Sequence, residues 1–184
     1  MVAMAKDKKQ TKSETLAVRL DARTRFALEL MARHRGQPLT TAVERAIMAA
    51  ANAEQLPHGK SAVNWSFFWD VSEGVRALRI AEFPEMFPTF EESRRLAFAV
   101  EHWPFFYSSP KRETCLNHYI DIIWPRIDEF VQFHEDMKSK DFFAAGKAMQ
   151  DAIRHAKLLP PDWPHKDSAL KQALEKLKPQ TSSE

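Results

Sequence analysis

The chain has one cysteine among its 184 residues, and no run of apolar residues long enough to cross a membrane. The single Cys115 excludes an intramolecular disulfide and fits a reducing compartment. A membrane-spanning helix would need about 18 consecutive apolar residues, so none is expected. The basic N-terminus is not followed by an apolar segment and is not expected to be a signal peptide. Together these features predict a cytoplasmic protein.

Common catalytic signatures are also missing. With only four glycines, the chain has no P-loop, dinucleotide fingerprint or G-x-S-x-G motif. Cys115 falls in a predicted helix among apolar neighbours, where a thiol is usually inert. We interpret the carboxylates of the second half as solvated faces rather than a catalytic pair: Asp121, Asp128, Glu129, Glu135 and Asp136. The sequence therefore predicts no catalytic residue, no cofactor and no enzymatic activity.

The histidines give no recognisable metal motif. His102, His118, His134 and His155 are scattered over the second half of the chain, and no H-x-x-x-H pair or cysteine pair accompanies them. Metal sites require several ligands to converge at about 2 Å from the ion, and spacing alone does not indicate such convergence here. We therefore predict no metal site.

Charge is unevenly distributed along the chain. Residues 1–56 hold 10 Lys or Arg and 6 Asp or Glu, a net charge of +4, whereas the remainder has a net charge of −2. The first 12 residues, which include Lys12, form a polar and basic segment that we expect to be a flexible arm. A basic front part favours contact with nucleic acid.

Residues 15–20 show the alternation of a half-buried strand. One face of the predicted strand carries Leu16, Val18 and Leu20, and the other carries Thr15, Ala17 and Arg19. One short strand cannot satisfy its backbone alone, so we expect two copies of the chain to pair strand to strand. The resulting two-stranded ribbon would fit the major groove of duplex DNA with its polar face toward the bases.

Two helices are predicted directly after this strand. The first spans about residues 22–35, with Asp21 as its N-cap and Gly36 at its end. The second begins near Thr41, where Thr41 and Glu44 have the spacing of a capping box. The expected inner faces carry Thr24, Leu28, Met31, Ala32 and Arg35 on the first helix, and Val43, Ala46, Ile47, Ala50 and Ala51 on the second.

This pattern of one strand and two helices resembles the ribbon-helix-helix DNA-binding family of the Arc and methionine repressors, over about residues 13–55. The matching positions are Leu16, Val18, Leu20, Asp21, Thr24, Leu28, Met31, Ala32, Gly36, Thr40, Thr41, Val43, Ala46 and Ile47. Thr24 stands where the family usually has a larger apolar residue, and Ala17 stands where a polar side chain is common.

The resemblance implies a homodimer that binds double-stranded DNA. The base-contacting positions would be Thr15, Ala17 and Arg19. The start of the second helix, at Thr40 and Thr41, would hold a phosphate, because helix N-termini attract anions. Arg23, Arg25 and Lys12 would add further phosphate contacts.

The rest of the chain is predicted to be helical. Residues 55–61 are interpreted as a linker, and residues 62–165 as a helical domain for oligomerisation or partner binding. The helices are expected over about 63–81, 90–103, 110–124, 127–133 and 140–158, with Pro125 as a break. A tail, residues 166–184, would hold a short amphipathic helix over 168–177. The expected fold class is mainly α, with an N-terminal ribbon-helix-helix followed by an all-helical C-terminal domain.

Three functions are weighed on this basis. The first is a sequence-specific transcriptional regulator whose helical domain contacts itself, RNA polymerase or another protein. The second is an antitoxin or relaxosome accessory protein that uses the same DNA-binding head, with the helical domain on a protein partner. The third, a small helical enzyme, has no candidate site. No membrane partner is expected.

Overall fold

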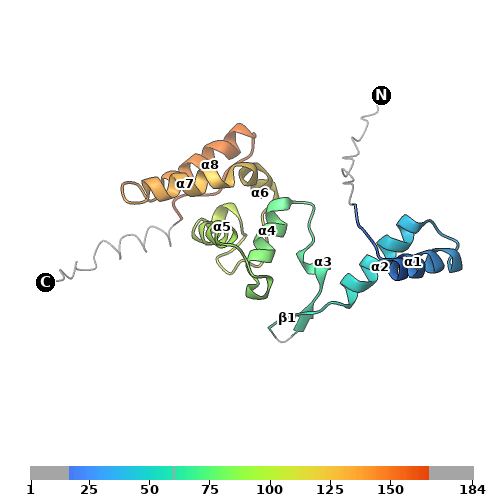
Figure 1. The fold of residues 1–184 in the computed structure, drawn as a ribbon. Helices are drawn as coiled ribbons and strands as arrows, with labels where there is room; N and C mark the ends of the chain where they lie inside the picture. The colour runs from blue at the N-terminus through green and yellow to red at the C-terminus, as the bar shows by residue number, and fades with distance from the viewer. Residues whose placement is uncertain (1–16, 60, 166–184) are drawn as a thin grey trace, which may run out of the picture. The chain divides into compact units, whose positions relative to one another are not determined.

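The computed structural model describes residues 17–59 and 61–165 and is mainly helical, as predicted (Figure 1). The chain divides into two compact units between Asn64 and Trp65. The predicted N-terminal arm (1–12) and the tail with its amphipathic helix (166–184) lie outside the described residues.

The N-terminal unit contains a helical hairpin followed by a β-hairpin. Helix α1 spans Ala22–His34 and α2 spans Leu39–Ala53. Strands β1 (Leu56–His58) and β2 (Ser61–Val63) pair antiparallel, with Leu56 opposite Val63 and His58 opposite Ser61. The prediction of a linker over 55–61 is therefore wrong. Gly59, with φ +59°, supplies the left-handed conformation that the turn needs.

Residues 17–20 are neither helical nor part of a strand in the single chain, and all four are exposed. The predicted strand at residues 15–20 thus has no hydrogen-bonded neighbour within the described residues, and Thr15 and Leu16 lie outside them. A strand requires a neighbouring backbone, and the described residues supply none to this segment.

The helical unit begins with two helices where one was predicted. The expected helix over 63–81 is broken into α3 (Trp65–Phe68) and α4 (Glu73–Ala81). Between them, Asp70 Oδ1 accepts hydrogen bonds from the Ser72 backbone (2.9 Å) and from Asn117 Nδ2 (2.9 Å). Ser72 then caps α4 by accepting from the Val75 backbone. These side-chain bonds compete with helix continuation.

In the middle of the helical unit, the structure confirms the predicted start of the helix near residue 90 but not the helix expected from residue 110. Helix α5 (Phe90–Glu101) starts with the predicted capping box of Thr89 and Glu92, preceded by the 3-10 turn η1 (Pro84–Met86) and followed by η2 (Trp103–Phe105). The helix expected from residue 110 is wrong, because residues 107 and 115 form a β-bridge instead and α6 spans only Asn117–Ile123.

Cys115 therefore lies in this bridge rather than in a helix. Burial raises the pKa of its thiol, which disfavours the reactive thiolate. The geometry thus agrees with an inert cysteine, although the predicted helical setting is incorrect.

The remaining helices complete the unit. Pro125 interrupts the helical path as predicted, through the 3-10 turn η3 (Trp124–Arg126) between α6 and α7 (Ile127–Met137). Helix α8 (Ala144–His155) packs on α7 and α6, and α5 packs on α4 and α7. Their shared core contains fully or nearly fully buried apolar residues: Val75, Leu78, Phe98, Phe105, Phe106, Tyr107, Ile120, Ile123, Phe130, Met149 and Ile153.

The segment after α8 folds back onto the unit and contributes Trp163 to this core. Trp163 Nε1 donates to the Phe143 carbonyl (3.1 Å), and the preceding Pro161 carbonyl accepts from Gln150 Nε2 (2.8 Å). The indole ring lies on Gly146, where a Cβ atom would overlap it. Gly146 therefore permits a close approach that no other residue allows.

Replacing this glycine tests the packing of the segment. We expect Gly146→Ala to lower the free energy of unfolding by about 1–2 kcal/mol, because the overlap with Trp163 outweighs the gain in helix propensity. Urea or thermal unfolding of the full chain measures this. In a Trp163→Ala background, the same Gly146→Ala change is expected to be neutral or stabilising. An equal loss in both backgrounds would contradict the assigned contact.

Candidate nucleic-acid interface

The start of α1 is fixed by Asp21, as predicted. Its Oδ1 accepts hydrogen bonds from the Arg23 (2.9 Å) and Thr24 (3.0 Å) backbones, and its Oδ2 accepts from Thr24 Oγ1 (2.6 Å). The Thr24 side chain, followed by these backbone donors, lowers the pKa of the Asp21 carboxyl. Asp21 thereby sets where residues 17–20 end and the helix begins.

The end of α1 is a complete Schellman motif. Gly36, with φ +58°, donates its N–H to the Arg33 carbonyl (3.1 Å), and the Gln37 N–H donates to the Ala32 carbonyl (3.0 Å). The Gln37 side chain in turn accepts from Arg45 Nη1 (2.7 Å) on α2. These bonds set the angle at which α2 leaves the turn.

The two helices meet through small side chains and leave large apolar ones outside. Within α1 and α2 only Ala32 and Ala42 are buried. The exposed large apolar side chains of residues 17–53 are Val18, Leu20, Phe26, Leu30, Met31, Leu39, Val43, Ile47 and Met48. Phe26 is 66% exposed and Ile47 is 55% exposed. The predicted inner faces, except at Ala32, are thus not buried by the single chain. Exposed apolar side chains in such number are unusual for a surface that stays in water.

The N-terminus of α2 lies two residues earlier than predicted. Pro38 is its N-cap, and its carbonyl accepts from the Ala42 N–H (3.1 Å). The predicted capping box of Thr41 and Glu44 is wrong, since no side chain caps this helix. Thr40 and Thr41 instead occupy the first turn. Uncapped first-turn N–H groups are a suitable site for an anion.

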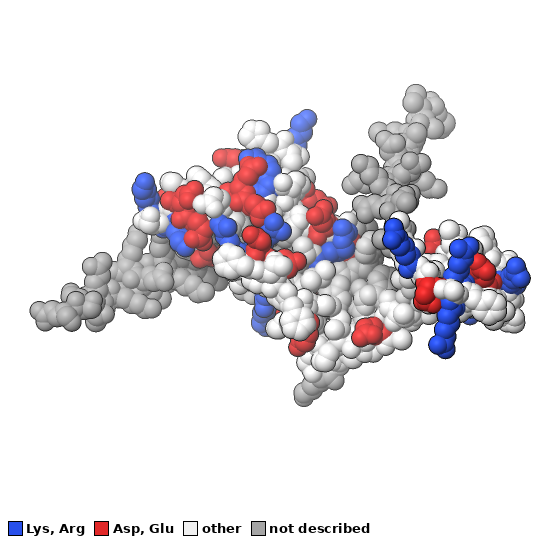
Figure 2. Space-filling view, viewed as in Figure 1, with Lys and Arg blue, Asp and Glu red and all other residues white. Residues whose placement is uncertain are grey.

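Of the predicted DNA-contacting residues that the structure describes, all are exposed except Thr41, which is half-buried. Ala17 and Arg19 precede α1, and Arg23 and Arg25 lie in its first turn. Arg25 Nε pairs with Glu29 Oε1 at 3.0 Å, and with both side chains solvent-exposed this pair contributes little and leaves the guanidinium accessible. Figure 2 shows Arg side chains, in blue, projecting from the α1–α2 region beside acidic ones. Thr15 and Lys12 lie outside the described residues.

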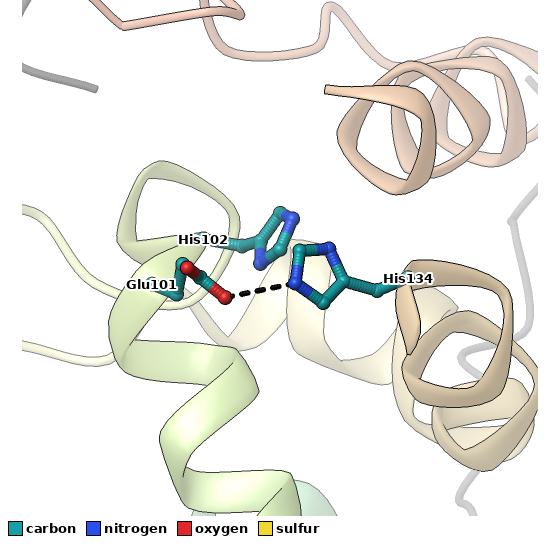
Figure 3. Close-up of side chains that lie close together, drawn as sticks. All are labelled: Glu101, His102 and His134. Carbon is teal, nitrogen blue, oxygen red and sulfur yellow. Dashed lines mark ion pairs between the residues drawn. The ribbon is translucent and has the colours of Figure 1, made fainter. Parts of the chain in front are cut away.

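The structure also brings together two of the four scattered histidines. His102, directly after α5, and His134, on α7, lie beside Glu101 (Figure 3), a convergence that the sequence analysis missed. They are 32 positions apart in sequence, so their spacing carried no signal.

Comparison with protein-family models, with curated protein sequences and with solved structures gives no match to this chain. Within the described residues, no helix is both long and apolar enough to cross a bilayer.

The capping role of Asp21 has a pH signature. Because the folded-state pKa is lowered, its stabilisation is present above the unfolded pKa of about 3.9 and is lost as the pH falls through the folded pKa. We expect Asp21→Ala to lower the melting temperature at pH 7, and Asp21→Ser, which keeps a capping oxygen, to lower it less. The difference between wild type and Asp21→Ser should shrink below about pH 4. A difference that is constant with pH would contradict the assigned carboxylate bonds.

Proposed function

We propose that this protein is a sequence-specific DNA-binding transcriptional regulator that acts as a homodimer in the cytoplasm. The observation that carries the proposal is the exposed apolar surface of α1 and α2, which follows directly on an exposed, non-helical segment at residues 17–20. A second copy of the same surface is the simplest cover for it, since homodimers with twofold symmetry place identical patches together.

In the proposed dimer, residues 15–20 of the two chains pair as an antiparallel ribbon. Pairing turns Val18 and Leu20, which are 64% and 44% exposed in the single chain, toward the α1–α2 surface. The alternation of the segment then directs Thr15, Ala17 and Arg19 to the opposite, solvent-facing side. The resemblance to the ribbon-helix-helix family supports the same arrangement.

The opposite side of the ribbon is the proposed reading surface. Arg19 would donate to guanine O6 and N7, Thr15 would hydrogen bond to a base edge, and Ala17 would contact a thymine methyl group. The first turn of α2, at Thr40 and Thr41, would hold a flanking phosphate. Arg23, Arg25 and Lys12 would contribute contacts to the backbone that depend on salt concentration.

The helical unit is proposed to bind a protein partner, such as RNA polymerase, or to extend oligomerisation. Its surface exposes Trp69, Val71, Phe87 and Phe90, with Phe87 88% exposed and Phe90 80% exposed. The same observation favours the alternative, an antitoxin or relaxosome accessory protein whose helical unit binds a toxin or relaxase. Co-purification of a toxin or relaxase with the full chain would favour the alternative.

The dimer is tested by a charge placed on the exposed apolar surface. We expect Ile47→Glu to weaken self-association on the order of a hundredfold or more, because the carboxylate would be buried without a partner. Ala49→Glu, on the opposite side of the same helix, serves as the matched control and should remain dimeric. Analytical ultracentrifugation measures both. A dimer of unchanged affinity in Ile47→Glu would exclude α2 from the interface.

DNA reading is tested by selection of bound duplexes from a random pool, which should enrich paired half-sites. On the enriched site, Arg19→Ala should reduce affinity about 10–100-fold and relax base preference, since one bidentate contact contributes about 1–3 kcal/mol. Arg33→Ala, at the far end of α1, removes the same charge and should retain the preference. Unchanged preference in Arg19→Ala would overturn the assigned readout, and no enrichment at all would favour the protein-binding alternative.

A further inference from the structure

Three side chains that can bind a metal ion meet where the end of α5 packs on α7 (Figure 3). Glu101 is the last residue of α5, His102 is its C-cap, and His134 lies on α7. One ligand atom from each lies within 4.8 Å of the other two. His134 Nε2 and Glu101 Oε2 are 3.0 Å apart.

Both imidazoles are buried with unused hydrogen-bonding capacity. His102 is fully buried and His134 is 5% exposed. His102 Nδ1 lies 3.1 Å from the Phe98 carbonyl, which can only accept, so Nδ1 carries the proton and Nε2 has a free lone pair. Within the described part of the chain, His102 Nε2 and His134 Nδ1 have no hydrogen-bond partner. Buried polar atoms of this kind call for a water or an ion.

The surroundings hold the His102 imidazole in place. Its ring stacks between Phe98 and Trp163, with centroid distances of 4.2 and 5.0 Å. A neutral imidazole is a metal ligand, and a hydrogen bond from its other nitrogen to a carbonyl orients it.

We propose that Glu101, His102 and His134 bind a divalent transition-metal ion of the zinc type, through one carboxylate oxygen and one ring nitrogen of each histidine. The 3.0 Å separation of His134 and Glu101 is close to the roughly 3.3 Å between two ligands on a tetrahedral ion with bonds of about 2.0 Å. The ion would replace the proton that these two groups share. Two imidazoles favour zinc, cobalt or nickel over calcium or magnesium.

The Glu101 side chain gives the site both charge and access. Its 40% exposed fraction opens one side of the otherwise buried cluster to solvent. Three protein ligands leave a fourth position on the ion for water or an exogenous group. The site lies wholly within the helical unit and does not rest on the proposed DNA binding.

The untagged full chain, stripped with a chelator, provides the test. After the stripped chain is incubated with Zn²⁺ and excess ion is removed, we expect one equivalent of Zn²⁺ by elemental analysis. Titration of the stripped chain with Co²⁺ should give the visible absorption of a low-symmetry Co²⁺ complex. Glu101→Gln keeps an oxygen that can accept from His134, so the fold should persist by circular dichroism, while Zn²⁺ affinity falls about tenfold or more. The control is His155→Gln, an exposed histidine of α8 outside the cluster, which should bind as wild type does.

A measurement on the wild-type protein removes any dependence on variant folding. Long-range proton–nitrogen NMR of the imidazoles should show, on Zn²⁺ addition, a ligation shift at one ring nitrogen of His102 and one of His134. The proposal is overturned if neither ring shifts, if Glu101→Gln binds as tightly as wild type, or if binding is lost in His155→Gln.

Discussion

The apolar surface that α1 and α2 leave uncovered constrains everything else in the N-terminal unit. Ala32 and Ala42 are the buried residues of the two helices, and burial of two small side chains removes little surface from water. Ordering a backbone costs about 1–2 kcal/mol per residue, which two alanines cannot offset. Covering side chains such as Phe26 and Ile47 would contribute about 1 kcal/mol or more each. The proposed association would therefore add stability by removing this surface from water.

The helical unit, in contrast, buries much of its apolar surface within one chain. Its core is filled by aromatic and branched side chains from α4 to α8, and the segment after α8 closes it with Trp163. Gly146 and Gly74 are placed where a neighbouring ring or side chain approaches too closely for any Cβ atom. The folded state of this unit thus needs no second chain. In the proposed regulator, the first unit would associate with a second chain, and the second unit would fold on its own core.

Local signals predicted the ends of α1 and the start of α5, although the same kind of signal was wrong for α2, and non-local contacts caused the other errors. Asp21, Gly36 and the Thr89 capping box act within three or four residues, so the sequence pattern alone was sufficient. The break after Phe68 depends on Asp70, whose partner Asn117 is 47 residues away. The missing helix after residue 110 is replaced by a bridge between Tyr107 and Cys115, which no helical periodicity reveals.

The candidate sites differ in the same way. Arg19, Thr40 and Thr41 could be proposed from the sequence because a strand and a helix N-terminus are local patterns. The cluster of Glu101, His102 and His134 could not be found, because it forms only when α5 and α7 pack. The N-terminal candidate interface, apart from the chain that would pair with its strand, can be predicted from the sequence. The metal-binding candidate can be identified only from the tertiary structure.

The histidine pair is difficult to explain by packing alone. An unsatisfied buried polar atom costs about 1–3 kcal/mol, and a domain of this size is stable by only about 5–15 kcal/mol. The unpaired His102 Nε2 alone therefore consumes a substantial fraction of that margin, and it is an atom that a bound ion would use as a ligand. Apolar side chains of similar volume would fill the space between Phe98 and Trp163 without that cost. The rings of Phe98 and Trp163 hold the His102 imidazole in place, and the carboxylate of Glu101 supplies the negative charge that a cation requires. The arrangement is costly for an empty core and favourable for a bound ion, and this difference is the physical basis of the proposed site.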